Sequence, residues 1–406
     1  MPMYQKRASI IGFDYGTHST KVVHRIRDEE LGRIVRFDIE HEGYPRNASP
    51  SVIREIDGRL YFGTKALQLQ DGENYGSLKS DLLHSSGDDE LDERIDVLTA
   101  AYLAWALGNI FRQDPQLVAD DPVIQFSAPT SHVGNEVLVN RYLRIAHACY
   151  TTVRQCLISI EQGVEHEDVV RVIRPLLHKP VPHQGDRRFG VLPETIAPIV
   201  SLQLQPFVIP GIYLIADMGA STTEMSVFAV NDERNDHSIL AYHDETDLQG
   251  GILLGEIAGM MVGPSQARLE QFLNVMQKQA NRVWHSGFCY DKNNRAASQR
   301  WKSLHVMLTG GATHHPDVRK HFDKRINPII AWPTNETLLQ VGRHAPTTLR
   351  CDAGYEESDL SLFAVANGLS IQRPKWPPFV HSHQIAPLMA ITHQEVELLP
   401  SYLEIG

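Results

Sequence analysis

An aspartate at the end of an apolar run, followed by a turn of small and hydroxyl residues, occurs twice in the sequence. The first copy is FDYGTHSTK, in which Asp14 precedes Gly16, Thr17, His18, Ser19 and Lys21. The second copy is ADMGASTTE, in which Asp217 precedes Gly219, Ala220, Ser221 and Thr222. A third turn of this kind, without the aspartate, is LTGGAT, with Gly310, Gly311 and Ala312.

These residue types suit a phosphate-bearing ligand. Small residues let backbone N–H groups approach phosphate oxygens, because no side chain blocks them. The hydroxyls of the turns can add hydrogen bonds, and the ammonium of Lys21 would offset phosphate charge. Asp14 and Asp217 would repel bare phosphates, but they are suitable oxygen ligands for Mg²⁺ and its water shell. The pattern therefore predicts a phosphate and metal site.

The two aspartates lie 203 positions apart (217 − 14), which is half of the 406-residue chain. Each follows an apolar segment that reads as a strand and precedes another such segment. An internal repeat of this length predicts two similarly folded halves with the ligand between them. The fold class we expect is α/β, with two lobes that each contain a mixed sheet and flanking helices.

The remaining elements are expected from periodicity and turn residues. In the first half we expect strands at 10–14, 19–25, 33–40 and 122–131, a hairpin turning at Asp57-Gly58, and helices at 95–113, 136–157 and 191–204. Residues 84–93 read as an exposed loop, and 161–190 give no clear pattern. In the second half we expect strands within 211–230, a strand, turn and helix over 305–322, and helices at 252–262, 266–288 and 359–372.

Composition narrows the functional classes. The net charge of −11 argues against nucleic acid or an anionic membrane as the main partner. The longest apolar segment, 97–111, is shorter than a membrane span requires, and the first ten residues lack the apolar core of a signal peptide. The 4 cysteines show no CxxC spacing, which favours a reducing, cytoplasmic location.

Five motifs in order resemble the superfamily of actin and the heat-shock protein 70 ATPases. They are DYGT (14–17), PETIAP (193–198), DMGASTTE (217–224), LTGGAT (308–313) and FAVANGLS (363–370). The segments NASPSVI and VIQFSAPTS make the chain most similar to the nucleotide-binding domain of heat-shock protein 70 chaperones. The resemblance covers about residues 8–372 and implies two actin-like (ribonuclease H-like) lobes around a nucleotide cleft. It places lobe I at 1–205 with an insertion at 40–85, lobe II at 206–358 with a reduced outer part, and a returning helix and tail at 359–406.

The resemblance also implies ATP or ADP with Mg²⁺ as cofactors, and roles for individual residues. Asp14 and Asp217 would hold the metal, Asp217 would orient the attacking water, and Glu194 would lie in the metal's outer shell. The two phosphate loops would contain Gly16, Thr17, His18, Ser19 and Lys21, and Gly219, Ala220, Ser221 and Thr222. Gly250 and Gly251 would lie by the ribose and phosphates, and Gly310, Gly311, Ala312 and His314 by the adenosine. Pro129 matches a proline that relays the nucleotide state between lobes.

Several positions depart from the chaperone pattern. The chaperones' lysine in the insertion has no match by simple alignment, which places Leu67 there and Lys65 two positions earlier. Lys21 instead matches a lysine that actin and sugar kinases keep in the first phosphate loop. Lys278 and Arg282 are the candidates for the basic residues that clamp the adenosine.

The resemblance implies a slow ATPase that acts as a nucleotide-dependent conformational switch for a protein partner, such as a co-chaperone-like factor. No β-sandwich substrate-binding domain is recognisable after the matched region. Three alternatives stay open: an actin-like filament-forming ATPase, a small-molecule kinase, and a pseudo-ATPase that serves as a scaffold. The missing chaperone lysine, together with His314 in place of the chaperones' adenine-stacking arginine, favours the last of these.

Overall fold

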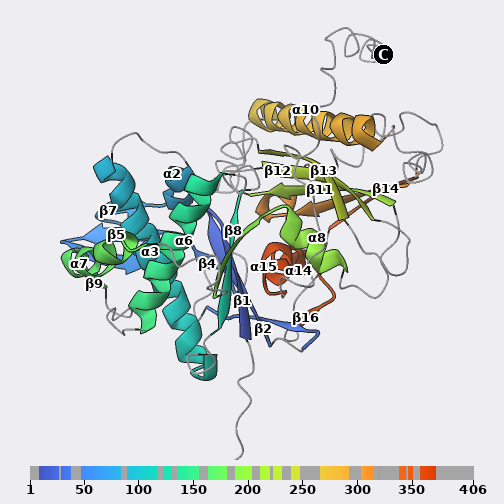
Figure 1. Ribbon diagram of the computed structural model, residues 1–406. Helices are drawn as coiled ribbons and strands as arrows, with labels where there is room; N and C mark the ends of the chain where they lie inside the picture. The colour runs from blue at the N-terminus through green and yellow to red at the C-terminus, as the bar shows by residue number, and fades with distance from the viewer. Residues whose placement is uncertain are drawn as a thin grey trace, which may run out of the picture.

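The protein is described here from a computed structural model. The described residues are 9–26, 29–37, 47–83, 89–117, 122–129, 135–154, 163–180, 188–203, 211–219, 223–230, 239–246, 266–291, 303–314, 318, 320, 338–343, 346–350 and 357–371. Over these ranges the fold is mixed α/β, with three sheets and helices between and around them (Figure 1).

The largest sheet has 7 strands in the order β10-β8-β1-β2-β3-β16, with β4 beside β2. Its strands are β1 (Ser9–Tyr15), β2 (Ser19–Ile26), β3 (Gly32–Ile34), β4 (Ser49–Pro50), β8 (Val123–Ala128), β10 (Phe189–Pro193) and β16 (Leu349–Arg350). β1 forms an antiparallel hairpin with β2 and lies parallel to β8, which lies parallel to β10. The carboxyl ends of β1, β8 and β10 therefore meet at one edge of this sheet.

A second sheet of 5 strands repeats this arrangement, in the order β13-β12-β11-β14-β15. Its strands are β11 (Gly211–Met218), β12 (Thr223–Val230), β13 (Ile239–Thr246), β14 (Ser303–Thr309) and β15 (Leu338–Arg343). As in the first sheet, a central strand pairs antiparallel with the next one and parallel with a later one. The strand order β3-β2-β1-β8-β10 in the first sheet thus matches β13-β12-β11-β14-β15 in the second, both in the order along the chain and in strand direction. This is the similarity that the repeated motif predicts.

Helices cover both sheets and fill the space between them (Figure 1). One face of the first sheet packs on α3 (Asp89–Gln113) and α6 (Glu136–Arg154) in the main hydrophobic core. On the other face lie α8 (Ile196–Gln203) and α15 (Ala364–Leu369), which contact each other. Ile199 and Leu202 of α8 also pack on Tyr213, Ile215 and Phe228 of the second sheet. α10 (Gln266–Asp291) covers β12 and β13.

The contact between α8 and α15 depends on small residues and a buried polar network. A Cβ atom on Gly368 would overlap the backbone of Ala197, so the two helices touch through their main chains. Asn367 donates from Nδ2 to the Ser201 hydroxyl of α8 at 2.7 Å, and accepts from Arg25 of β2 at 2.7 Å. Asn367 therefore joins α15 to the first sheet and to α8.

A third sheet, with the order β7-β5-β6-β9, is wholly antiparallel and lies beside α7 (Figure 1). Its strands are β5 (Ile53–Ile56), β6 (Arg59–Phe62), β7 (Glu73–Tyr75) and β9 (Val164–Glu165), and nearby lie α1 (Gly63–Gln68), α2 (Leu78–Leu83) and α7 (His166–Leu177). The hairpin at Asp57-Gly58 is confirmed, with positive φ at both residues.

Three expectations from the sequence need correction. The expected loop at 84–93 is helical from Asp89, because the acidic first turn of α3 suits a helix N-terminus. The helix expected at 191–204 begins only at Ile196, because the buried segment before it pairs with β8 as strand β10. The strand expected at 33–40 ends at Ile34.

Residues 161–190, for which no element is expected from the sequence, contain β9, α7 and the start of β10. The helix expected at 359–372 is two short helices, α14 (Glu357–Ser361) and α15. The helix expected at 252–262 lies outside the described residues.

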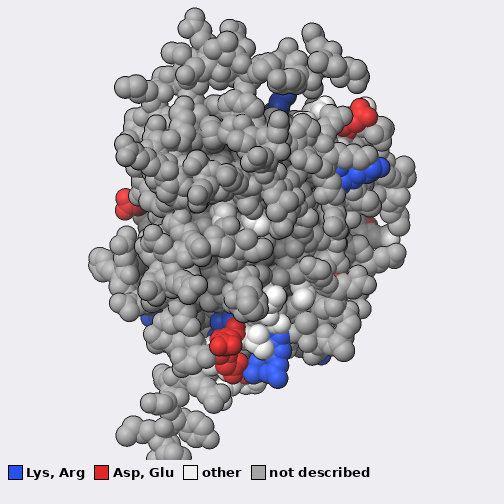
Figure 2. All heavy atoms as spheres, turned by 90° about the vertical axis from the view of Figure 1, so that its right-hand side faces the viewer, with Lys and Arg blue, Asp and Glu red and all other residues white. Residues whose placement is uncertain are grey.

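Within the described ranges, no helix is both long and apolar enough to cross a membrane. Figure 2 shows one face of the molecule, on which acidic and basic side chains of the described residues lie scattered or next to one another. The described part of that face therefore has no extended surface of a single charge.

Candidate functional site

The first part of the candidate site is the edge of the large sheet where β1, β8 and β10 end. Asp14 is the next-to-last residue of β1, and Glu194 directly follows β10. The Glu194 N–H donates to the Ala128 carbonyl at 3.0 Å, which holds the ends of β8 and β10 together. Pro129 is buried directly after β8. Since the three strands are parallel, Asp14 and Glu194 lie at the same edge.

The β1–β2 hairpin pairs Asp14 with Lys21. The two residues are opposite each other in the antiparallel register, so their side chains point to the same face. Lys21 Nζ lies 3.0 Å from Asp14 Oδ2, and the Ser127 hydroxyl donates to Asp14 Oδ1 at 3.4 Å. A Cβ on Gly16 would lie 2.6 Å from the Ser19 carbonyl oxygen, so this turn needs a residue without a side chain.

A second lysine reaches the same edge from α2. Lys79 forms an ion pair with Glu194, and the side chains are only 4% and 5% exposed. Burial alone lowers the pKa of Lys79, but the carboxylates of Glu194, Asp14 and Glu224 outweigh it and raise that pKa above its ordinary value. Lys79 is therefore held as a buried cation among carboxylates.

Asp217, at the end of β11, brings the second sheet into this cluster. Burial, together with the nearby carboxylates of Glu194 and Asp14, raises its pKa from 3.8 to about 7. The ammonium groups of Lys21 and Lys79 act in the opposite direction. The charges of Asp14, Glu194, Lys21 and Lys79 thus act on Asp217, which places the two matched aspartates, one from each sheet, in one charged cluster.

The third turn lies directly beside Asp217. β14 is parallel to β11, with Thr309 opposite Asp217, so the two strands end together. Gly310 has φ +88°, and a Cβ there would lie 2.5 Å from the Met218 carbonyl oxygen and 2.6 Å from Asp217 Oδ1. This close approach of one turn to another requires glycine at position 310.

The structure brings together many of the predicted residues. Asp14, Gly16, Thr17, His18, Ser19 and Lys21 lie on the β1–β2 hairpin, Glu194 after β10, Asp217 and Gly219 at the end of β11, and Gly310 and Gly311 after β14. Ala312 and His314 belong to the short 3₁₀-helix Gly311–His314, but their side chains are not described. Ala220, Ser221, Thr222, Gly250 and Gly251 lie outside the described residues.

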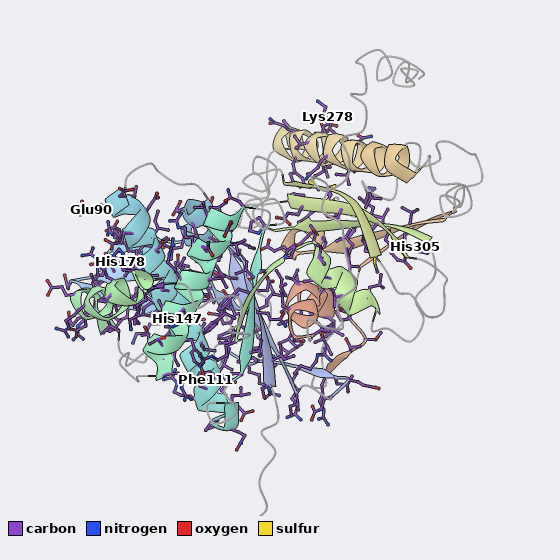
Figure 3. All side chains as sticks on the ribbon, in the orientation of Figure 1. Glu90, Phe111, His147, His178, Lys278 and His305 are labelled. Atoms are coloured by element: carbon purple, nitrogen blue, oxygen red, sulfur yellow. The ribbon has the colours of Figure 1, made fainter. Side chains whose placement is uncertain are left out.

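The sequence did not indicate Lys79, because simple alignment places Leu67 at the position of the chaperones' lysine and Lys65 two positions earlier. Lys65 is exposed on α1, with its ammonium 5.6 Å from the centre of the Tyr61 ring, and Leu67 is half-buried. The sequence feature that could have indicated a buried Lys79 is its apolar context, in the segment SLKSDLL after strand β7. Lys278 also falls outside the cluster, since it is exposed on the outer side of α10 (Figure 3).

The donor set fits a magnesium nucleotide. Two ammonium groups and turns of small residues suit phosphate oxygens, and buried carboxylates suit a hydrated Mg²⁺. Among the described residues, no three His, Cys, Asp or Glu side chains are arranged to bind a metal directly. Mg²⁺ in proteins usually keeps several waters and is bound through only one or two carboxylates.

A cavity of about 620 Å³ lies elsewhere, between α3, α6 and α7, near His178 (Figure 3). Arg141 binds Asp96 at 2.7 Å, and Glu93 pairs with Arg174 at 3.0 Å and His178 at 2.8 Å. This cavity is not lined by any of the small-residue turns, so the cluster at the strand ends is the stronger candidate site.

Comparison with models of known protein families finds no match, and neither does comparison with curated protein sequences.

Proposed function

We propose that the chain is a Mg-ATP-binding protein of the actin and heat-shock protein 70 type, in which two actin-like lobes bind nucleotide between them. The observation that carries the proposal is the meeting of Asp14 and Asp217. These residues occupy matching positions in two sheets of the same strand order, and the Asp14 carboxylate is among the charges that raise the pKa of Asp217. A site assembled from two related halves is what the repeated motif predicts.

In this proposal the chain's own residues mainly position and neutralise charge. Lys21 and Lys79 would bind phosphate oxygens, and the backbone N–H groups of the turns after β1 and β14 would be available to the phosphates. Asp14 and Asp217 hold the hydrated metal, whose chemical contribution when bound is to neutralise charge that develops on the phosphates. Asp217, ionised in the complex, accepts a hydrogen bond from the attacking water and orients it.

The presence of Lys79 favours hydrolysis over a purely structural role. The scaffold alternative gained weight from the missing chaperone lysine. Lys79 is a buried cation beside Glu194, Asp14 and Asp217, and it can take the role that neither Leu67 nor Lys65 can fill. We therefore propose slow ATP hydrolysis rather than nucleotide binding alone.

The position of α8 and α15 supports a conformational switch. Both helices lie between the two sheets, and α8 packs on both of them. If nucleotide binding changed the distance between the sheets, it would therefore also alter the packing of α8 against α15. For a nearly complete switch, ATP must bind one conformation about 10⁴-fold more tightly than the other. We propose that a protein partner distinguishes the two conformations.

The direct test measures ATP binding by calorimetry and phosphate release, both with Mg²⁺, on the wild type and on Asp217→Asn. We expect wild-type binding with slow turnover, and a turnover in Asp217→Asn reduced about 10²-fold or more. Asp168→Asn, on the exposed side of α7, is the matched control and should behave as the wild type.

Two results would contradict the proposal. Failure of the wild type to bind ATP with Mg²⁺ would overturn it completely. Tight binding without turnover would overturn the enzymatic part and leave the scaffold alternative. ATP-dependent sedimentation of the purified protein would instead favour the filament-forming alternative.

A further inference from the structure

Both carboxylates at the edge of the large sheet are already bound to a lysine. Lys21 Nζ lies 3.0 Å from Asp14 Oδ2, with side chains 13% and 9% exposed, and Lys79 pairs with Glu194 in still deeper burial. The second oxygen of Asp14 accepts from Ser127 at 3.4 Å. A cation that approaches Asp14 or Glu194 therefore meets an ammonium group already bound to that carboxylate.

An ammonium group and a divalent cation cannot both stay close to the same carboxylate at low cost. Like charges repel strongly in a buried site, where solvent screening is weak. Water-excluded ion pairs also have to be separated before another cation gains access to the oxygens. The lysines and a divalent cation therefore compete for Asp14 and Glu194.

A phosphate-bearing ligand changes this balance. Its oxygens bind ammonium groups well, so it can take both lysines from their carboxylates. We propose that Lys21 and Lys79 compete with divalent cations for Asp14 and Glu194, so that the protein binds such a cation tightly only together with a nucleotide. The nucleotide part of this inference rests on the proposed function, whereas the competition itself rests on the two ion pairs.

The test measures binding of Mn²⁺, which takes the same oxygen ligands as Mg²⁺, by electron paramagnetic resonance without nucleotide. The proteins are the wild type, Lys79→Met, Lys21→Met and the control Lys65→Met, which removes an exposed lysine outside the cluster. We expect Mn²⁺ to bind Lys79→Met and Lys21→Met about tenfold or more tightly than the wild type, and Lys65→Met to be unchanged.

The double variant Lys79→Met/Glu194→Gln tests whether the increase in Mn²⁺ affinity depends on the Glu194 carboxylate. It should lose the gain of Lys79→Met, because the freed carboxylate is gone. Since Lys79→Met leaves a buried charge without its partner, Lys21→Met is the second, less buried variant for the same measurement. Equal Mn²⁺ affinity in the wild type and in both folded lysine variants would overturn the inference.

The effect of nucleotide on Mn²⁺ affinity is a separate measurement. In the wild type, ATP should raise the affinity for Mn²⁺ strongly, and in the lysine variants this increase should be smaller. If the wild type binds no ATP but the variants gain Mn²⁺ affinity, the proposed function fails and the competition stands. If the wild type binds Mg-ATP and the variants gain nothing, the competition fails and the proposed function stands.

Discussion

The two hairpins β1–β2 and β11–β12 have the same register but opposite charge at one position. In the first, Asp14 is opposite Lys21, and in the second, Asp217 is opposite Glu224. The pairs are offset by the same 203 positions (217 − 14 and 224 − 21). One hairpin therefore neutralises its own aspartate, and the other places two acidic residues across from each other.

The difference shows that the candidate site is assembled asymmetrically. The cations that lower the pKa of Asp217 are Lys21 and Lys79, and both belong to the first half of the chain. Among the described residues, the cations that act on the aspartate of the second hairpin thus come from the first half of the chain. A site of this kind requires both sheets, although each sheet repeats the same topology.

The largest effect should come from removing Lys79, the more deeply buried of the two cations. Lys79→Met leaves Glu194 charged without a partner, and we expect a loss of about 3–5 kcal/mol in the free energy of unfolding. Urea denaturation measures this loss. Lys65→Met, a surface change, should stay within about 0.5 kcal/mol of the wild type. An equal, small effect in both variants would show that Lys79 is not needed to neutralise the cluster.

The next effect is a pH dependence specific to Asp217. Its pKa of about 7, against 3.8 ordinarily, means that between these values the folded protein keeps a proton that the unfolded chain has released. The free energy of unfolding therefore falls as pH rises through this window, by about 2–3 kcal/mol from pH 5 to pH 8.

The measurement is urea denaturation at both pH values, with EDTA and without nucleotide. Asp217→Asn should lose this part of the pH dependence, whereas Asp168→Asn on the exposed side of α7 should keep it. The same slope in Asp217→Asn and in the wild type would contradict the assignment.

A smaller effect on stability should distinguish alanine substitutions at two neighbouring glycines beside the second hairpin. Gly310→Ala places a Cβ 2.5 Å from the Met218 carbonyl oxygen at a residue with φ +88°, and we expect a destabilisation of about 1–3 kcal/mol. Gly311→Ala meets no atom within 4 Å and serves as the matched control. Thermal unfolding of both variants makes the comparison. Equal melting temperatures would show that the third turn does not need to approach Asp217 closely.

Much of the fold followed from local patterns. The hairpins at 10–25 and 211–230, the helices α3, α6 and α10, and the repeated strand–aspartate–turn were predictable because each is encoded by apolar periodicity and turn residues within a short segment. The boundary at PETIAP was not predictable in this way. There, pairing with β8 keeps an apolar segment in a strand that would otherwise read as helical.

The sequence by itself determined that two aspartates, 203 positions apart, end matching strands next to small-residue turns. Only the tertiary structure decided which cations accompany them. Lys79 reaches Glu194 from α2, 115 positions away in the chain, and the apolar context of Lys79 does not indicate which carboxylate it pairs with. The physical reason is that charge compensation in a buried cluster depends on distance in space. That distance is fixed by the packing of β1, β8, β10 and α2, not by spacing along the chain.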